Sequence, residues 1–207
     1  MVEHQLRRRG IADARILDAF RKVPREAFVS AEQAHLAYGD HPLPIPAGQT
    51  ISQPYIVALM IESAGIGPRD RVLEIGAGSG YAAAVIGQIA SDVVAIERHP
   101  ELVEYASERL AQLGYENVRI VEGDGTLGWP EGAPYDVILA AASGSHVPEP
   151  LIAQLAIGGR IVMPIGAPGG AQELVRVVRE ADGRLRQSSL GGVRFVPLIG
   201  VEAWTDG

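Results

Sequence analysis

The 207-residue chain contains 47% hydrophobic and 21% charged residues, the balance of an ordinary globular protein, and its length fits one domain with a full core. The net charge of −7 argues against sequence-independent binding to nucleic acid, and the absence of cysteine excludes disulfides and thiolate chemistry. The five histidines lack metal-ligand spacing, so we expect no metal. No apolar run is long enough to cross a bilayer and no signal peptide is visible, so we expect a cytoplasmic protein without a membrane partner.

The first 70 residues are predicted to form a helical cap with an irregular loop. Apolar spacing indicates helices near residues 2–9, 13–20 and 53–64. The stretch GDHPLPIPAGQ at 39–49 is rich in Pro and Gly, which predicts an ordered loop or a lid. The basic run Arg7-Arg8-Arg9 is interpreted as the solvated face of the first helix rather than as a contact for nucleic acid.

Residues 71–170 alternate between short apolar runs and helical patterns. The apolar runs are rich in Val and Ile and nearly continuous, which is typical of parallel strands covered on both faces. Helices are predicted over 79–90, from His99 to Leu113, and over about 149–155. This alternation predicts an α/β fold with a doubly wound, mostly parallel, Rossmann-like sheet. The predicted strands are 71–75, 93–97, 118–122, 136–141 and 160–165.

Residues 171–207 show strand patterns without a helix between them. We predict strands at 173–180 and 193–200 that form an antiparallel pair at the edge of the sheet. The chain is therefore predicted to be a single domain over 1–207 with three regions. These are a helical cap with its loop (1–70), an α/β core (71–170) and antiparallel C-terminal strands (171–207).

Gly76, Gly78 and Gly80 stand in VLEIGAGSGY, between the first predicted core strand and a helix. Glycine here allows a tight turn and lets a ligand approach the backbone beside the positive end of the helix. The dinucleotide fingerprint needs its third glycine one place later, where Tyr81 stands, so NAD is disfavoured. A glycine turn without any ligand is the alternative interpretation.

Two acidic residues follow the next two predicted strands. Glu97 ends the second strand, where a carboxylate can accept hydrogen bonds from both ribose hydroxyls of a nucleoside. Asp124, in EGDGTLG after the third strand, is placed to meet an adenine amino group. Taken alone, Glu97 reads as a solvated charge and Asp124 as a turn residue. Because these residues and the glycine loop share the carboxyl edge of one sheet, together they predict a nucleoside site.

The series EIGAGSGY, VVAIE and EGDG resembles the class I S-adenosylmethionine-dependent methyltransferases. More narrowly, the chain is similar to the protein-L-isoaspartate O-methyltransferase family through VEHQLRRRGIADARILDAFRKVPREAFV, QTISQPYIVALM, APYDVILAAA, QLAIGGRIVMPIG and VRFVPL. The resemblance implies a seven-stranded sheet and S-adenosyl-L-methionine as cofactor, with S-adenosyl-L-homocysteine as product. It also implies a transferase that methylates the free carboxylate of isoaspartyl residues in age-damaged proteins and peptides and so starts their repair.

The resemblance also implies the site residues. Ser52, in TISQP, stands at the position of the family's active-site serine. Substrate contacts are expected from Ile51, Tyr55 and Val196, and Val196 would offer main-chain hydrogen bonds to an extended peptide unless its segment is an ordinary edge strand. The residues expected to bind the cofactor are Thr50, Gly76, Gly78, Ser79, Gly80, Glu97, Arg98, Asp124 and Gly125.

Two compatible roles are predicted for Ser52. It can cap the helix that begins near residue 53, and a helix start also attracts anions because its first amides lack intrahelical partners. The pKa of an isoaspartyl carboxyl should be about 4, so the group is already ionised at neutral pH. It needs alignment rather than a general base, and Ser143-Gly144-Ser145-His146 places a serine beside a histidine without making a triad. We therefore expect the Ser52 hydroxyl to position the substrate carboxylate.

Other functions stay open at this point. A methyltransferase for RNA, DNA or a small metabolite would share the glycine loop and differ in the Ser52 region and VRFVPL. A dehydrogenase is disfavoured by Tyr81, and a protein that binds S-adenosylmethionine without turnover is a further alternative. We expect a monomer. Tyr38 and Asp40 match the loop that overlies the site in the family, and the role of Asp40 is left open.

Overall fold

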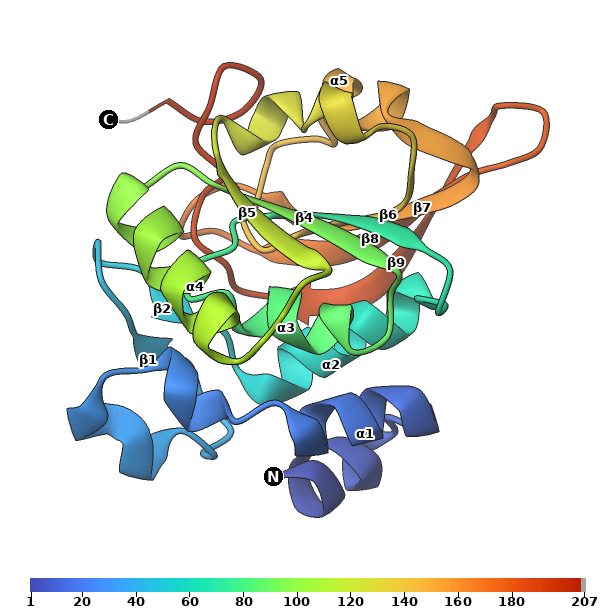
Figure 1. Cartoon of the computed structure of the whole chain (residues 1–207). Helices are drawn as coiled ribbons and strands as arrows, with labels where there is room; N and C mark the ends of the chain where they lie inside the picture. The colour runs from blue at the N-terminus through green and yellow to red at the C-terminus, as the bar shows by residue number, and fades with distance from the viewer. Residues whose placement is uncertain (206–207) are drawn as a thin grey trace.

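A seven-stranded sheet forms the centre of the computed structural model, which describes residues 1–205 (Figure 1). Its strands are β3 (Arg71–Ile75), β4 (Asp92–Glu97), β5 (Val118–Glu122), β6 (Tyr135–Ala140), β7 (Leu155–Gly166), β8 (Gln172–Arg179) and β9 (Leu185–Val193). The spatial order is β5-β4-β3-β6-β7-β8-β9, parallel from β5 to β7 and antiparallel from β7 to β9. The direction of winding reverses between β3 and β6, in the middle of the sheet.

Alternate residues of each central strand enter two separate hydrophobic cores. Val72 and Val137 are buried in the core on one face of the sheet, whereas Leu73 and Ile138 are buried in the core on the other face. This explains why the central strands are apolar without alternation, since both of their faces are covered. The predicted α/β class is confirmed.

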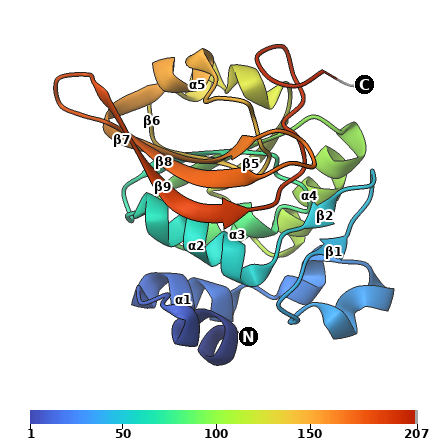
Figure 2. The same ribbon diagram turned by 180° about the vertical axis from the view of Figure 1, so that it is seen from behind.

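Helices cover both faces, but unequally. On one face lie α2 (Pro54–Ala64), α3 (Tyr81–Gly87) and α4 (Pro100–Gln112), and α1 (Ala14–Lys22) packs against α2 and α3 from outside. The short helix α5 (Glu149–Ala153) lies on the opposite face. Figures 1 and 2 show the resulting layers, with the blue N-terminal cap beneath α2 and α3 and farthest from α5.

The predicted strands and helices of the core all form, with shifted ends. The start of α4 at Pro100 and the left-handed Gly114 (φ 73°) after its end match the predicted punctuation. The helix predicted over 79–90 is shorter, because Gly80 adopts a left-handed φ of 84° and delays the start of α3. The helix predicted to reach residue 155 ends at Ala153, because β7 already begins at Leu155.

The C-terminal edge differs from the prediction. β8 pairs antiparallel with β7 as expected, but its second partner is β9, and the strand predicted at 193–200 is wrong. The sequence of β9, LRQSSLGGV, is polar and Gly-rich, so pairing with β8 rather than local propensity makes it a strand. In VRFVPL, Pro197 has no N–H to donate, and this part of the chain makes isolated bridges instead. The predicted third region extends to residues 206–207, which lie outside the described part.

The N-terminal cap is helical but more broken than predicted. In place of one helix over 2–9, a π-helical turn (Val2–Leu6) leads into a 3-10 turn (Arg7–Arg9) that ends at Gly10, whose φ is 101°. Further 3-10 turns occupy Arg25–Phe28 and Ala31–Leu36.

The predicted loop at 39–49 is ordered by a small hairpin. Within it, β1 (Leu43–Pro44) pairs antiparallel with β2 (Thr50–Ile51). Since β2 leads through Ser52 and Gln53 into α2, the hairpin places the start of that helix at the carboxyl edge of the sheet.

Candidate active site

A cavity of about 820 Å³ lies at the carboxyl ends of β3 and β6, where the strand order reverses. Open α/β sheets bind their ligands at this place. The walls come from the β2–α2 junction, the loop after β3, the end of β4 and the chain beyond β9. The predicted site residues that line the cavity are Thr50, Ile51, Ser52, Gly76, Gly78, Ser79, Glu97, Arg98, Gly125 and Val196.

The Glu97 carboxylate is fixed by backbone amides on two sides. The Gly78 amide donates to Oε2 at 2.9 Å, and the amides of Arg98 and His99 donate to Oε1 at 2.8 and 3.0 Å. These contacts join the glycine loop to the start of α4 through one carboxylate. These three bonds use three of the roughly four acceptor positions of the carboxylate, and the remaining position, on Oε2, can still accept a hydroxyl group of a ligand.

The three glycines of the loop serve different purposes. Gly76 and Gly78 line the cavity with left-handed φ values of 83° and 54°, which favour glycine. Gly80, also predicted to bind the cofactor, does not line the cavity. A Cβ at Gly80 would lie 3.1 Å from the Ala106 Cβ, so this glycine allows α3 and α4 to pack closely.

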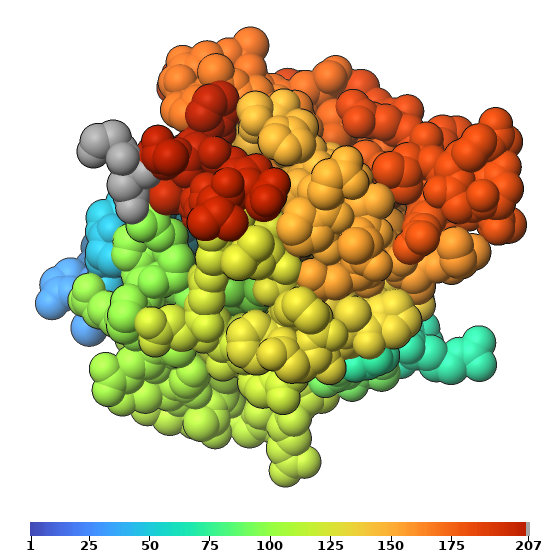
Figure 3. All heavy atoms as spheres, turned by 90° about the horizontal axis from the view of Figure 1, so that it is seen from above, coloured from blue at the N-terminus to red at the C-terminus, as the bar shows by residue number. Residues whose placement is uncertain are grey.

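Asp124 is likewise absent from the cavity lining. Its Oδ1 accepts hydrogen bonds from the Thr126 amide at 2.9 Å and hydroxyl at 2.7 Å, and its Oδ2 accepts one from the Val201 amide at 2.9 Å. The carboxylate therefore caps the 3-10 turn Gly125–Leu127 and holds the C-terminal segment, as the turn interpretation expected. Seen from above, the dark red C-terminal residues pack against the yellow middle of the chain (Figure 3).

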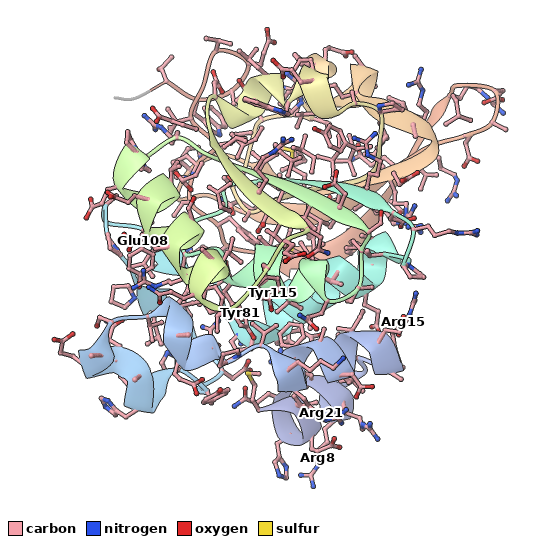
Figure 4. All side chains as sticks on the ribbon, viewed as in Figure 1. Arg8, Arg15, Arg21, Tyr81, Glu108 and Tyr115 are labelled. Atoms are coloured by element: carbon pink, nitrogen blue, oxygen red, sulfur yellow. The ribbon has the colours of Figure 1, made fainter. Side chains whose placement is uncertain are left out.

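Tyr55, the third predicted site residue outside the lining, contacts the N-terminal cap. The Arg9 guanidinium lies 3.4 Å from the centroid of the Tyr55 ring and pairs with Asp40 at 2.6 Å, and Gln53 Nε2 donates to the Asp40 carbonyl at 3.0 Å. All three arginines of the run are exposed, as predicted, but Arg9 is held by these two contacts, whereas Arg8 points outward (Figure 4). Asp40, whose role the sequence left open, holds Arg9 over Tyr55.

Ser52 does not cap α2. Proline occupies the first position of the helix, so the N-cap falls on Gln53, and no side chain caps the helix. The capping interpretation of Ser52 is therefore wrong. Within residues 1–205 its hydroxyl has no hydrogen-bond partner, and it lines the cavity between Ile51 and the start of α2. This side chain is available to a ligand.

Val196 offers a ligand less than predicted. Its carbonyl already accepts a hydrogen bond from the Ser143 amide at 2.8 Å, and the Leu198 amide donates to the Ser143 carbonyl at 2.8 Å. The Val196 amide has no partner within residues 1–205, and the residue is 40% exposed at the cavity. One main-chain donor therefore remains for an extended peptide.

Glu74 is a lining residue that the sequence reasoning missed. It is 2% exposed in β3, and its Oε2 has no hydrogen-bond partner among the described residues. Burial, and then the neighbouring charge of Glu97, raise the pKa of the Glu74 carboxyl to about 8. The available signal was a carboxylate among the apolar residues Val72, Leu73 and Ile75 of the strand RVLEI. A cationic group of a ligand would favour its ionised form.

Tyr81 joins the cavity wall to the N-terminal cap. Its ring meets Phe20 and Phe28 edge-on at centroid distances of 6.0 and 5.6 Å, and the buried Arg25 guanidinium lies 5.0 Å from the ring centroid. Figure 4 shows Tyr81 at the junction between the central helices and the cap.

Trp204 and Thr205 also line the cavity and were not predicted. Among residues 1–205, no group of three or more His, Asp or Glu side chains could hold a metal ion, and no helix is long and apolar enough to span a bilayer.

Comparison with solved structures defines the class of protein. A protein-L-isoaspartate O-methyltransferase matches 98% of this chain over 67% of its own, with a TM-score of 0.88 and 34% identity. A Plasmodium falciparum structure in complex with S-adenosyl-L-homocysteine matches with a TM-score of 0.83 and 26% identity over 96% of both chains. The fold and the site define an S-adenosylmethionine-dependent methyltransferase.

Sequence comparison defines the family. The model of the protein-L-isoaspartate(D-aspartate) O-methyltransferase family matches residues 1–203. Protein-L-isoaspartate O-methyltransferase 2 of Pelobacter propionicus is 56% identical over 204 residues, which cover 99% of this chain and 91% of the relative. The enzyme of Methylorubrum populi is 58% identical over 199 residues, 96% of this chain and 93% of its own. The chain belongs to the protein-L-isoaspartate(D-aspartate) O-methyltransferase family.

Proposed function

We propose that the cavity aligns the free carboxylate of an L-isoaspartyl residue with the donor methyl group and that Ser52 positions this carboxylate. As a member of its family, the chain transfers a methyl group from S-adenosyl-L-methionine to isoaspartyl residues of damaged proteins and peptides, which starts their repair. One observation carries the residue assignment. The unpartnered Ser52 hydroxyl and the carboxylate held at the glycine loop line the same cavity.

The lining fits the cofactor at two charged or polar points. Glu97, with an acceptor position left on Oε2, suits a ribose hydroxyl. Glu74, with an unpartnered buried oxygen, suits the cationic ammonium group of the methionine part. When bound, the cofactor supplies an electrophilic methyl group on a sulfonium. Further contacts are assigned to lining residues of the predicted set: Thr50, Gly76, Gly78, Ser79, Arg98 and Gly125.

The acceptor requires placement rather than proton removal. Its carboxylate is already charged at neutral pH, so a nucleophile is present without a general base. The chain must exclude water and hold the reacting oxygen about 3–3.5 Å from the methyl carbon. The Ser52 hydroxyl donates one hydrogen bond to the carboxylate, and the free Val196 amide donates one to a carbonyl of the peptide backbone.

A methyl-transfer assay with three versions of one peptide tests the assignment. The acceptor position carries isoaspartyl, normal aspartyl or amidated isoaspartyl, and transfer of labelled methyl from S-adenosylmethionine is counted. We expect label on the isoaspartyl peptide alone, because the other two lack the displaced free carboxylate. Equal label on the normal aspartyl peptide would remove the repair assignment and favour another acceptor.

Location and assembly are part of the proposal. We place the enzyme in the cytoplasm, where the cofactor and ageing proteins are both available, and cell fractionation tests this. We propose a monomer that needs no nucleic acid, because one chain supplies the cavity walls and the net charge of −7 opposes phosphate backbones. Light scattering tests the assembly, with 21.9 kDa expected for the monomer.

A further inference from the structure

Gln172, at the start of β8, forms a set of buried hydrogen bonds to the chain beyond β9. The residue is 5% exposed. Its Oε1 accepts a hydrogen bond from the Phe195 amide at 2.6 Å, and its Nε2 donates to the Phe195 carbonyl at 3.1 Å. Nε2 also donates to Ser143 Oγ at 2.9 Å. The side-chain amide of Gln172 thus pairs with both backbone groups of Phe195, as a neighbouring strand would.

Ser143 holds the same part of the chain from the other side. It is fully buried near the start of the loop that connects β6 to α5. Its amide donates to the Val196 carbonyl at 2.8 Å, and its carbonyl accepts from the Leu198 amide at 2.8 Å and from Trp204 Nε1 at 3.0 Å. Its Oγ faces Gln172. Each polar group of Ser143 therefore serves the C-terminal segment or the residue that anchors it.

The position of Gln172 marks the place where regular pairing ends. The ladder between β8 and β9 closes with the pair Gln172–Val193, and from residue 194 onward the chain leaves the sheet edge. We call residues 194–198 the acceptor wall, because Val196 and Pro197 line the cavity from there. At this point the hydrogen bonds of the Gln172 side chain to Phe195 replace the backbone hydrogen bonds between β8 and β9. Without it, the amide and carbonyl of Phe195 would lose their partners.

We propose that Gln172, supported by Ser143, is a positioning residue for the acceptor peptide. It fixes the acceptor wall so that the free Val196 amide faces the cavity at a set distance from the Ser52 hydroxyl. The inference rests on the proposed function, since it concerns how the acceptor is held. Gln172 does not line the cavity itself, so it acts through Phe195 and Val196.

The cofactor end of the cavity is anchored independently of Gln172. The carboxylate of Glu97 is held by the glycine loop and the start of α4. Beyond the acceptor wall, the amides of Val201 and Glu202 bond to Asp124 at 2.9 Å and to Thr126 Oγ1 at 3.3 Å. Loss of the Gln172 contacts should therefore displace the acceptor wall while the cofactor contacts stay in place.

The test compares Gln172→Met with Gln187→Met. Methionine resembles glutamine in length but cannot make these hydrogen bonds, and Gln187 is an exposed residue of β9 that controls for the substitution. Three quantities are measured: hydrogen exchange at the Phe195 amide, affinity for S-adenosyl-L-homocysteine by calorimetry, and kcat and KM for an isoaspartyl peptide. For Gln172→Met we expect faster exchange, an affinity within twofold of the parent, and kcat/KM lower by about tenfold. Gln187→Met should match the parent in all three.

Two further variants keep the test decisive if Gln172→Met does not fold. Gln172→Glu retains an acceptor for the Phe195 amide but donates to neither Phe195 nor Ser143, so kcat/KM should fall in the same direction. Ser143→Ala removes one partner of Nε2 and leaves both bonds to Phe195, so it should change kcat/KM by less than the Glu variant.

Two results would overturn the inference. One is a fall in cofactor affinity as large as the fall in kcat/KM, which would mean a general loss of structure. The other is rapid exchange at Phe195 with unchanged kinetics, which would make the contacts irrelevant to the acceptor. If the parent enzyme methylates no isoaspartyl peptide, the proposed function fails instead, and the exchange at Phe195 still reports on the anchoring.

Discussion

The Ser52 hydroxyl is dispensable for the fold, since it neither caps α2 nor bonds to another described residue. A hydrogen bond to a charged group contributes about 1.5–3 kcal/mol. Ser52→Ala should therefore lower kcat/KM for an isoaspartyl peptide by about tenfold to a hundredfold and leave the Tm unchanged. Steady-state kinetics and thermal melting measure the two effects. A lower Tm with an unchanged rate would assign Ser52 a structural role only.

Glu74 should make cofactor affinity depend on pH. Its pKa of about 8 means that the free enzyme holds this carboxyl protonated at neutral pH, whereas a bound ammonium group favours the carboxylate. Binding must then release a proton, so affinity should weaken as pH falls below 8. Between pH 7.5 and 6, calorimetry with S-adenosyl-L-homocysteine should show a loss approaching tenfold per pH unit.

Glu74→Gln is the matched control for this pH effect. The amide keeps the shape of the side chain but does not titrate. Its affinity should be lower than that of the parent at pH 8 and nearly independent of pH below it. The same slope in both proteins would show that another group releases the proton.

At the scale of elements, the start of α2 is tied to the N-terminal cap through Arg9. Its guanidinium stacks on Tyr55, near the start of the helix, and pairs with Asp40 in the loop before it. Arg9→Ala should raise the KM for the isoaspartyl peptide a few-fold, because a partly exposed cation–π contact contributes about 0.5–1 kcal/mol. Arg9→Lys should restore part of the loss, since lysine keeps the charge but not the planar stacking group.

Arg8→Ala serves as the control for Arg9→Ala, because Arg8 is the neighbouring residue and its side chain points outward (Figure 4). It should leave the peptide KM unchanged. Equal effects of the two alanine variants would point to the loss of positive charge at the surface rather than to the position of α2.

Sequence patterns predicted the elements that are buried and missed those that depend on tertiary pairing. The largely apolar runs RVLEI and VVAIE predict β3 and β4, because strands that are covered on both faces are mostly apolar. β9 carries no such signal, since its residues are mostly exposed and its partner β8 supplies the structure. VRFVPL has the residues of a strand, yet it is held by the side chain of Gln172 and the backbone of Ser143, contacts that no local pattern contains.

The candidate site was predictable for the same reason and to the same extent. The role of glycines and carboxylates at strand ends can be predicted from the sequence, because the topology brings the strand ends together. Gly76, Gly78 and Glu97 do meet at the cavity. The direction in which each side chain points could not be predicted from the sequence. Asp124 and Tyr55 have suitable positions in the sequence, but one bonds to the C-terminal segment and the other packs under Arg9.

At the scale of the whole molecule, the cavity joins three regions of the chain: residues before β3, the α/β core and the chain beyond β9. A ligand there should stabilise all three together. At a hundred times its Kd, S-adenosyl-L-homocysteine should add about 2.7 kcal/mol and raise the Tm by about 5–10 °C in one transition. Differential scanning calorimetry measures this. Two transitions, one with a Tm that the ligand does not change, would contradict the single domain predicted from the sequence.

The path of the last described residues has a practical consequence. Thr205 lines the cavity, and the indole of Trp204 is fastened to the backbone of Ser143. A bulky label attached at Thr205 would thus compete with a bound ligand for the cavity. The N-terminal cap lies beneath α2 and α3 (Figure 1), and none of residues 1–48 lines the cavity, so labels for surface immobilisation belong on the cap.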